Sequence, residues 1–418
     1  MWAFYFFAFV LVLLGVSSLK GGLEFLRYVR GEMEKEKSDF TPLACVIAPC
    51  RGLDQGLEEN VRALFMQDYP TYGIIFVTDS ADDPALDVVE KVRKDFASSG
   101  SISSRVCVAG EARESGQKVH NLRAAVKEIN PDSRVLVFVD TDARPHASWL
   151  RSLIAPLLDE SVGAATGYRW FIPVHGGFSS QMRSVWNASI ASALGARRDK
   201  NFCWGGATAI RRETFERLRM RERWRGTLSD DFALTRALQQ ERLPIHFVPD
   251  CLTASLEDCN FRELLEFTTR QLKITRVYAA HLWKAVLGGS ALFVLIFFGG
   301  ILLVATRALQ HKPVLVPIIF LVTVYLLGTA KSYVRLKAVS MPLAQHAREL
   351  RRSAFAHLFL WPLATLIYLY NAIAAALSRK IVWRGLTYEL RSPTKTVIAH
   401  SASQKEMAAT TRTQDYYE

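Results

Sequence analysis

Two aspartates, Asp140 and Asp142, directly follow the most apolar strand-like run of the sequence, residues 135–139. Side chains alternate along an extended chain, so residues two apart point to the same side and both carboxylates face one way. Mg²⁺ and Mn²⁺ prefer hard oxygen ligands and keep coordination sites for phosphate. The pair therefore predicts a divalent-cation site that holds a nucleotide diphosphate and neutralises its charge as it departs.

A second acidic pair, Asp230 and Asp231, stands where a helix is predicted to begin, with Ser229 as a candidate N-cap. One of the two carboxylates could serve only to cap the helix. The other could act as a base toward an acceptor hydroxyl, which requires an approach of about 2.6–3.2 Å. The local pattern leaves open which aspartate takes which role, and we place Asp230 among the residues of the acceptor pocket.

Other residues suit contacts with a sugar or a phosphate. Cys203 and Trp204 precede Gly205, where backbone can approach a ligand closely while the indole lies against a sugar or apolar face. A plain tight turn explains the glycine almost as well. Lys118 could meet a phosphate or could simply be a solvated lysine at a helix start, and Asp79 follows another predicted strand.

The segment that must position these residues alternates strand-like and helix-like patterns. The predicted strands are 43–48, 73–77, 105–108 and 135–139, and the predicted helices are 57–67, 84–96 and 118–129. Such alternation predicts an α/β domain with a mostly parallel sheet over residues 40–260. Ligands of open parallel sheets lie outside the carboxyl ends of the strands, where the aspartates gather. A rim of carboxylates is costly without a cation or polar ligand.

Hydrophobic residues concentrate in four stretches that lack Asp, Glu, Lys and Arg. These are residues 1–19, 285–306, 313–330 and 353–378. About 20 apolar residues are needed to cross a bilayer. The first stretch lacks a preceding basic region and a clear cleavage site, which favours an uncleaved transmembrane anchor over a signal peptide. Residues 285–378 form a membrane region with about three hydrophobic segments.

The net charge of +12 arises largely from Lys and Arg beside these stretches. Such placement is typical of cytoplasmic flanks that meet anionic lipids, and it argues against nucleic acid as a partner. We expect a multi-pass membrane protein with its catalytic domain in the cytoplasm, at a bacterial inner membrane. Four full crossings would place the segment after Ser378 outside, whereas its basic residues favour the inside. Either the third stretch therefore does not cross fully, or the fourth, which contains Pro362, is broken. Residues 379–418 are predicted to form a basic and polar tail, disordered beyond Pro393.

Residues 261–284 are predicted to form an amphipathic helix at the membrane interface, with its apolar residues toward lipid. Its basic residues, including Arg270 and Lys273, could instead face the pocket and receive the diphosphate. These two roles can coexist.

These residues together resemble the family 2-type inverting glycosyltransferases of the GT-A fold, and more narrowly ceramide glucosyltransferase and its bacterial relatives. The resemblance covers about residues 40–280. Asp83, Asp140 and Asp231 are similar to the three spaced aspartates of that family. The resemblance implies that Asp83 lies near the nucleotide and that Asp231 is the base.

Two further motifs bear on the resemblance. Lys118 resembles the lysine of a Lys-x-x-Asn-Leu segment near the donor, and Cys203 with the glycines that follow resembles a pocket loop. The family's Arg/Gln-x-x-Arg-Trp motif departs here, because Lys273 and Ile274 replace its second Arg and its Trp. Lysine lacks the bidentate fork of arginine, and isoleucine offers no stacking surface.

The resemblance implies a donor such as UDP-glucose or UDP-N-acetylglucosamine and transfer of a single sugar with inversion. The expected acceptor is a membrane lipid such as ceramide or another hydroxylated lipid. One alternative is a processive polysaccharide synthase, against which the altered motif and the few transmembrane segments count. Another is a catalytically inactive membrane scaffold, against which the three aspartates count.

Overall fold

The computed structural model describes residues 1–36, 38–97 and 100–399. Seven strands form one sheet in the order β3-β2-β1-β4-β6-β5-β7, in which β6 runs antiparallel to both neighbours and the other pairs are parallel. The strands are β1 (Ala44–Pro49), β2 (Tyr72–Thr78), β3 (Ile102–Val108), β4 (Val135–Val139), β5 (Ala164–Ile172), β6 (Ala207–Arg211) and β7 (Ile245–Leu256). The predicted α/β domain with a mostly parallel sheet is confirmed.

Helices cover both faces of this sheet. They are α2 (Leu57–Phe65), α3 (Ala85–Asp95), α4 (Gln117–Ala125), α5 (Trp149–Ile154), α6 (Phe178–Ala191), α7 (Arg212–Arg217), α8 (Met220–Arg223) and α9 (Asp230–Gln240). Neighbouring strand residues enter opposite cores: Val46 packs in one hydrophobic cluster and Ile47 in the other. A strand buried on both faces needs apolar residues at consecutive positions, which explains the unbroken apolar runs.

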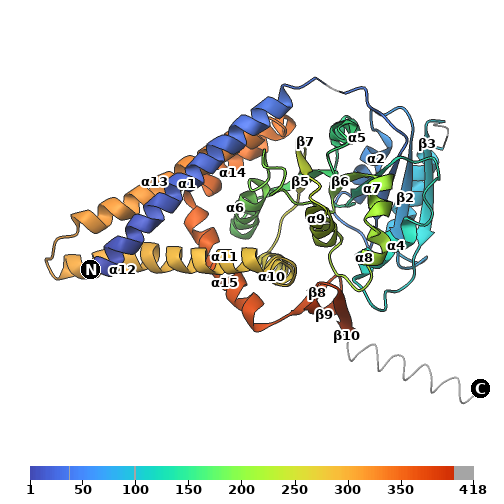
Figure 1. Cartoon of the computed structure of the whole chain (residues 1–418). Helices are drawn as coiled ribbons and strands as arrows, with labels where there is room; N and C mark the ends of the chain where they lie inside the picture. The colour runs from blue at the N-terminus through green and yellow to red at the C-terminus, as the bar shows by residue number, and fades with distance from the viewer. Residues whose placement is uncertain (37, 98–99, 400–418) are drawn as a thin grey trace, which may run out of the picture.

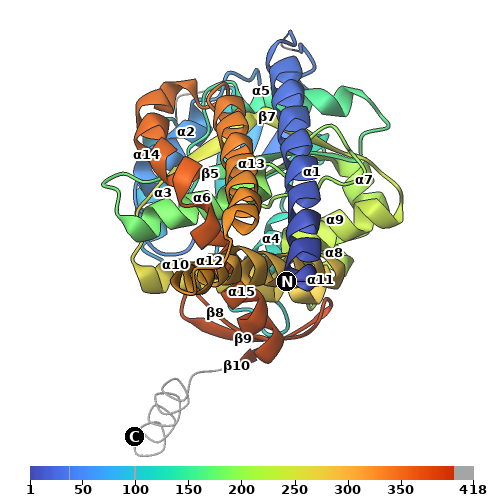
Figure 2. The same cartoon turned by 90° about the vertical axis from the view of Figure 1, so that its left-hand side faces the viewer.

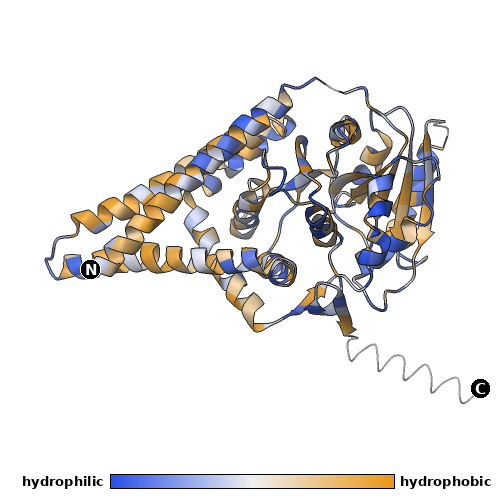
Figure 3. Ribbon diagram, viewed as in Figure 1, coloured by the Kyte–Doolittle hydropathy of each residue, from blue (hydrophilic) through white to orange (hydrophobic). Residues whose placement is uncertain are grey.

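Among the residues that the structure describes, three helices are long and apolar enough to cross a membrane: α1 (Trp2–Met33), the continuous helix Ala280–Leu309, and α13 (Leu315–Val339). The second comprises α11 (Ala280–Phe293), a π-helical turn (Val294–Phe298) and α12 (Gly299–Leu309). Figures 1 and 2 show α1 beside α13, and Figure 3 shows that apolar residues dominate the end of this bundle farthest from the sheet.

Helix α1 extends well beyond the predicted anchor of residues 1–19. Its second half packs on the α/β domain, where Phe25 and Val29 are buried and the Tyr28 hydroxyl donates to the carbonyl of Phe247 at 2.5 Å. The helix is therefore apolar in its first half and packs against the edge strand β7 with its second half.

The fourth apolar stretch is bent. A 3₁₀ turn (Ala344–His346) and α14 (Ala347–Phe359) meet α15 (Trp361–Leu377) at an angle of 72°. The bend falls just before Pro362, which cannot continue a regular helix hydrogen-bond pattern. This geometry agrees with the alternative in which the fourth stretch is broken.

Helix α10 (Phe261–Tyr278) begins with a capping box formed by Asn260 and Glu263. The expectation that its apolar residues face lipid is wrong for three of them, because Leu264, Leu272 and Ile274 are buried against protein. The helix packs on α15, α11 and α6 instead. It therefore sits between the apolar helices and the α/β domain.

The segment predicted as a basic and polar tail forms a second, three-stranded sheet. Its antiparallel strands are β8 (Lys380–Trp383), β9 (Leu386–Ser392) and β10 (Lys395–Ala399). The prediction of disorder beyond Pro393 is thus wrong for β10, and residues 400–418 lie outside the described part of the chain. The alternation of β9 buries Tyr388 and Leu390 against α10, a period-two pattern that its polar composition conceals.

Candidate active site

A cavity of about 1960 Å³ opens at the carboxyl ends of β1 and β4. Its walls include the start of α9, one face of α10 and the turn between β8 and β9. It continues along the apolar helices α11 and α15. The predicted rim of the sheet and two apolar helices therefore line one space.

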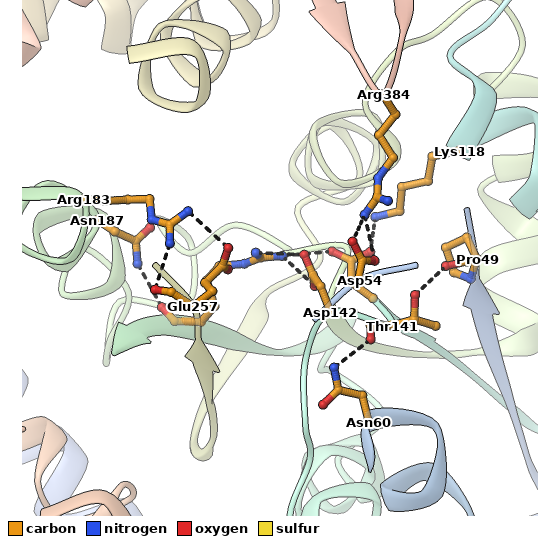
Figure 4. Close-up of polar contacts among 12 residues, drawn as sticks. Pro49, Asp54, Asn60, Lys118, Thr141, Asp142, Arg183, Asn187, Glu257 and Arg384 are labelled. Carbon is orange, nitrogen blue, oxygen red and sulfur yellow. Dashed lines mark hydrogen bonds and ion pairs between the residues drawn. The ribbon is translucent and has the colours of Figure 1, made fainter. Parts of the chain in front are cut away.

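The loop after β4 is held so that its two aspartates face this cavity. Thr141 lies between them, donates its hydroxyl to the carbonyl of Pro49 at 3.2 Å, and accepts at its own carbonyl from the Asn60 amide at 3.0 Å. Both anchors, drawn in Figure 4, hold the buried Thr141 in place. Asp140 and Asp142 on either side of it line the cavity.

Cations surround these two carboxylates. The Lys118 ammonium lies 2.6 Å from Asp140, and the Arg169 guanidinium lies 3.3 Å from Asp140 and 3.2 Å from Asp142. Burial opposes ionisation of both Lys118 and Asp140, yet their attraction raises the pKa of the lysine and lowers the pKa of the aspartate. Lys118 is therefore a buried cation of the site rather than a solvated lysine.

The second acidic pair lies opposite. Ser229 caps α9 by accepting from the Phe232 amide at 3.2 Å, and Asp231 accepts from that amide at 2.7 Å and from the Ser229 hydroxyl. Asp230 is buried 3.5 Å from Lys118, and burial raises the pKa of Asp230 to about 6. Asp231 is less buried and also lines the cavity.

The pocket loop brings Cys203, Trp204 and Gly205 to the same wall, as predicted. The Trp204 ring lies under Arg169, whose guanidinium carbon is 4.8 Å from the ring centroid. A Cβ on Gly205 would meet the Lys118 ammonium at 2.7 Å and would also clash with Asp230. Only glycine fits this position, so the residue is more than a turn former.

Several residues of the site were not predicted from sequence. Arg169 lies inside β5, and a charged residue in a buried strand was the available signal. Arg183 pairs with Glu257 at 3.1 Å on the same wall. Arg384 reaches Asp54 at 2.8 Å from the C-terminal sheet, a contact across 330 residues that no local pattern reveals.

Three predicted donor-binding residues do not line the cavity. Asp79 lies 3.5 Å from Arg51, and Lys273 donates to the carbonyl of Lys380 at 2.7 Å. Asp83 accepts from the amide of Gly52 at 2.9 Å, which holds the loop after β1. Their predicted contacts with a nucleotide stay predictions, whereas Arg270 does line the cavity.

Positive charge also gathers around Arg270. Burial, with repulsion from Arg169 and Arg384, lowers the pKa of Arg270 to about 10. Its guanidinium lies over the rings of Phe267 and Trp383, and it forms no ion pair with the residues described. An anionic ligand would relieve this repulsion.

Within the described ranges, no cluster of three or more His, Cys, Asp and Glu side chains could hold a metal ion. The predicted ligands Asp140 and Asp142 face the same cavity and share Arg169. Mg²⁺ is commonly bound by one or two carboxylates together with substrate phosphates. The residues therefore fit a cation shared with a diphosphate, and they do not fit a cage made of protein ligands alone.

The mostly parallel sheet and the charged cavity at its carboxyl edge define a glycosyltransferase of the GT-A class, here joined to apolar helices. Comparison with known families agrees with this class. The chain belongs to glycosyl transferase family 21, whose family model matches residues 2–396.

Individual relatives are more distant. The chain is 27% identical over 121 residues to ceramide glucosyltransferase 3 of Caenorhabditis elegans, a match that covers 29% of this chain and 25% of that protein. The chain thus spans about a quarter of the length of this curated relative.

Two solved structures are similar in part. Mannosyltransferase PcManGT from Pyrobaculum calidifontis, in complex with GDP-Man and Mn²⁺, is 17% identical with a TM-score of 0.46, covering 89% of this chain and 98% of that chain. Glucosyl-3-phosphoglycerate synthase from Mycobacterium tuberculosis is 16% identical with a TM-score of 0.36, covering 59% and 82%.

Proposed function

We propose that this glycosyltransferase moves a single sugar, of the glucose or N-acetylglucosamine type, from a UDP-sugar to the hydroxyl of a membrane lipid, with inversion. Ceramide or another hydroxylated lipid is the expected acceptor. One observation carries the proposal: a single cavity joins the carboxylates of the sheet edge to the membrane helices α11 and α15.

The membrane side of the cavity suits an alkyl chain. Ala285, Val286 and Gly289 of α11 line it, together with Thr365 and Tyr368 of α15. A Cβ on Gly289 would meet no atom within 4 Å, so this side of α11 is open. An acyl or alkyl chain lying here would bring a terminal hydroxyl toward Asp231 while its tail stays among apolar residues.

The opposite side suits the donor. Lys118, Arg169, Arg270 and Arg384 surround the same space and supply positive charge for a diphosphate. The partial match to a ceramide glucosyltransferase supports a glucose-type donor and a hydroxylated lipid. The basic flanks of the apolar segments support a cytoplasmic catalytic domain at an inner membrane.

Asp231 takes the proton of the acceptor hydroxyl, and the oxygen attacks the anomeric carbon on the side opposite the diphosphate, which inverts that centre. Asp140 and Asp142 would hold a Mg²⁺ or Mn²⁺ ion, which when bound neutralises charge on the departing diphosphate. Lys118 lies between Asp140 and Asp230. Its positive charge offsets the repulsion between these two buried carboxylates.

Mass spectrometry of lipids tests this function. Membranes containing the protein are incubated with labelled UDP-glucose, UDP-N-acetylglucosamine and GDP-mannose, and the lipids are then extracted. We expect one lipid class to gain one hexose or N-acetylhexosamine. Label in long oligosaccharides would instead support a polysaccharide synthase, and no transfer from any donor would contradict the proposal.

A further inference from the structure

The turn between β8 and β9 has an unusual residue in it. Trp383 pairs with Leu386, so Arg384 and Gly385 form a two-residue turn, with φ of 48° and 78°. Two positive φ values are typical of a type I′ hairpin turn, where Asn-Gly is the favoured sequence. Arginine in this conformation is unfavourable, and such residues concentrate at functional sites.

The Arg384 side chain points into the cavity. Its Nη2 donates to both carboxylate oxygens of Asp54 at 2.8 Å, and its Nη1 donates to the carbonyl of Arg51 at 2.5 Å. A guanidinium carries five N–H donors in a rigid fork. Its Nε has no hydrogen-bond partner in the part of the chain that the structure describes. Asp54 therefore orients the guanidinium and leaves donors free.

Contacts between the C-terminal sheet and α10 fix the position of this turn. Lys273 donates to the carbonyl of Lys380, and Ile274 and Tyr278 pack against Tyr388 in one apolar cluster. Figure 1 shows β8 and β9 beside α10. The two positions where α10 departs from the family motif thus anchor this sheet.

The residue before the turn also contributes an aromatic ring to the cavity wall. The indole of Trp383 lies against Arg270, whose guanidinium carbon is 5.4 Å from the ring centroid. Both residues line the cavity together with Arg384. An arginine and a tryptophan from the C-terminal sheet therefore stand beside α10, on the side of the cavity that carries its cations.

We propose that Arg384, oriented by Asp54, binds the diphosphate of the sugar donor and closes the donor end of the cavity with the β8–β9 turn. The inference rests on the proposed use of a nucleotide-sugar donor. Arginine suits this role because it stays charged and its remaining N–H groups can donate charged hydrogen bonds to phosphate oxygens. Lys118 and Arg169 pair with Asp140 and Asp142, the predicted metal ligands, whereas Arg384 pairs with Asp54.

Nucleotide binding tests the proposal without requiring an acceptor. Isothermal titration with Mn²⁺ compares UDP with UMP, and GDP with GMP, on the full chain in nanodiscs. The variant Arg384→Asn removes the guanidinium but suits a positive φ, so the turn should stay folded. We expect its diphosphate affinity to fall on the order of 10- to 100-fold, as charged hydrogen bonds imply, with monophosphate affinity nearly unchanged.

Arg391→Asn is the matched control. Arg391 lies on β9, pairs with Glu389 at 3.6 Å and is outside the cavity lining, so both affinities should stay at the wild-type level. Equal diphosphate binding by Arg384→Asn and wild type, or equal loss of diphosphate and monophosphate, would overturn the inference. A wild-type chain that binds neither nucleotide series would overturn it too.

The two proposals fail in different ways. Diphosphate binding that depends on Arg384, without transfer of sugar to any lipid, would contradict the proposed function and leave the assignment of Arg384 standing. Lipid glycosylation with full activity in Arg384→Asn would contradict the assignment of Arg384 and leave the proposed function standing.

Discussion

The ammonium group of Lys118 lies 2.6 Å from a carboxylate oxygen of Asp140. The lysine belongs to the first turn of α4 and the aspartate to the loop after β4, so the contact joins two separate edges of the site. Both side chains are largely buried, and the lysine reaches Asp230 as well. One cation thus holds together the two acidic pairs that the sequence places far apart.

Replacing Lys118 with methionine should destabilise the protein by about 3–5 kcal/mol, because buried carboxylates would lose their paired cation. Denaturant titration followed by circular dichroism measures the change. Lys127→Met, at an exposed position soon after α4, should leave the free energy of unfolding almost unchanged. Equal stability of the two variants would show that the Lys118 pairs contribute nothing.

Gly205→Ala should lower turnover on the order of 100-fold, since its methyl group would displace Lys118 and Asp230, and small shifts in a site have effects of this size. Gly195→Ala is the control, because a Cβ there meets no atom within 4 Å. Initial rates of sugar transfer report the difference. Normal rates in Gly205→Ala would mean that the pocket loop can move aside freely.

The stability of Asp230→Asn relative to wild type should depend on pH. The pKa of Asp230 is about 6 in the folded protein and about 3.9 in an unfolded chain. Because the folded-state pKa is the higher one, protonated Asp230 stabilises the fold fully at pH values below about 3.9. This contribution is lost as the pH rises through about 6. The melting temperature of the variant minus that of wild type should therefore be greater at pH 8 than at pH 5. A difference that does not change with pH would contradict the burial of a titrating Asp230.

Gly289→Trp should lower transfer to lipid at least about tenfold, a change that corresponds to only 1.4 kcal/mol, because the ring would fill the membrane side of the cavity. Nucleotide binding should stay intact. Gly288→Trp is a close control: it also has open space around it but does not line the cavity. Similar transfer by both variants would place the acceptor elsewhere.

Much of the catalytic domain follows from local patterns. The apolar run of β4 has the predicted bounds, and Asp140, Asp142 and Asp231 all face the cavity, because strand ends and a helix start are marked within a few residues. Strand β3 begins at Ile102, earlier than predicted, since an edge strand tolerates the serines that precede its apolar residues.

The remainder of the site depends on contacts between distant segments. Asp54 and Arg384 carry no motif of their own, and they meet only because α10 docks the C-terminal sheet over the cavity. The burial of the apolar residues of α10 has the same origin: an amphipathic pattern shows that one face is covered, but not whether lipid or protein covers it.

The central claim is tested most directly by comparing wild type with Asp231→Asn in proteoliposomes that contain the acceptor lipid and labelled UDP-sugars. Transfer should fall about 10²- to 10⁴-fold, the range that a general base supplies, while UDP-sugar binding stays near the wild-type level. The wild-type product should be a lipid carrying one sugar. Unchanged turnover in purified Asp231→Asn, or the absence of any glycosylated lipid with wild type, would contradict the account.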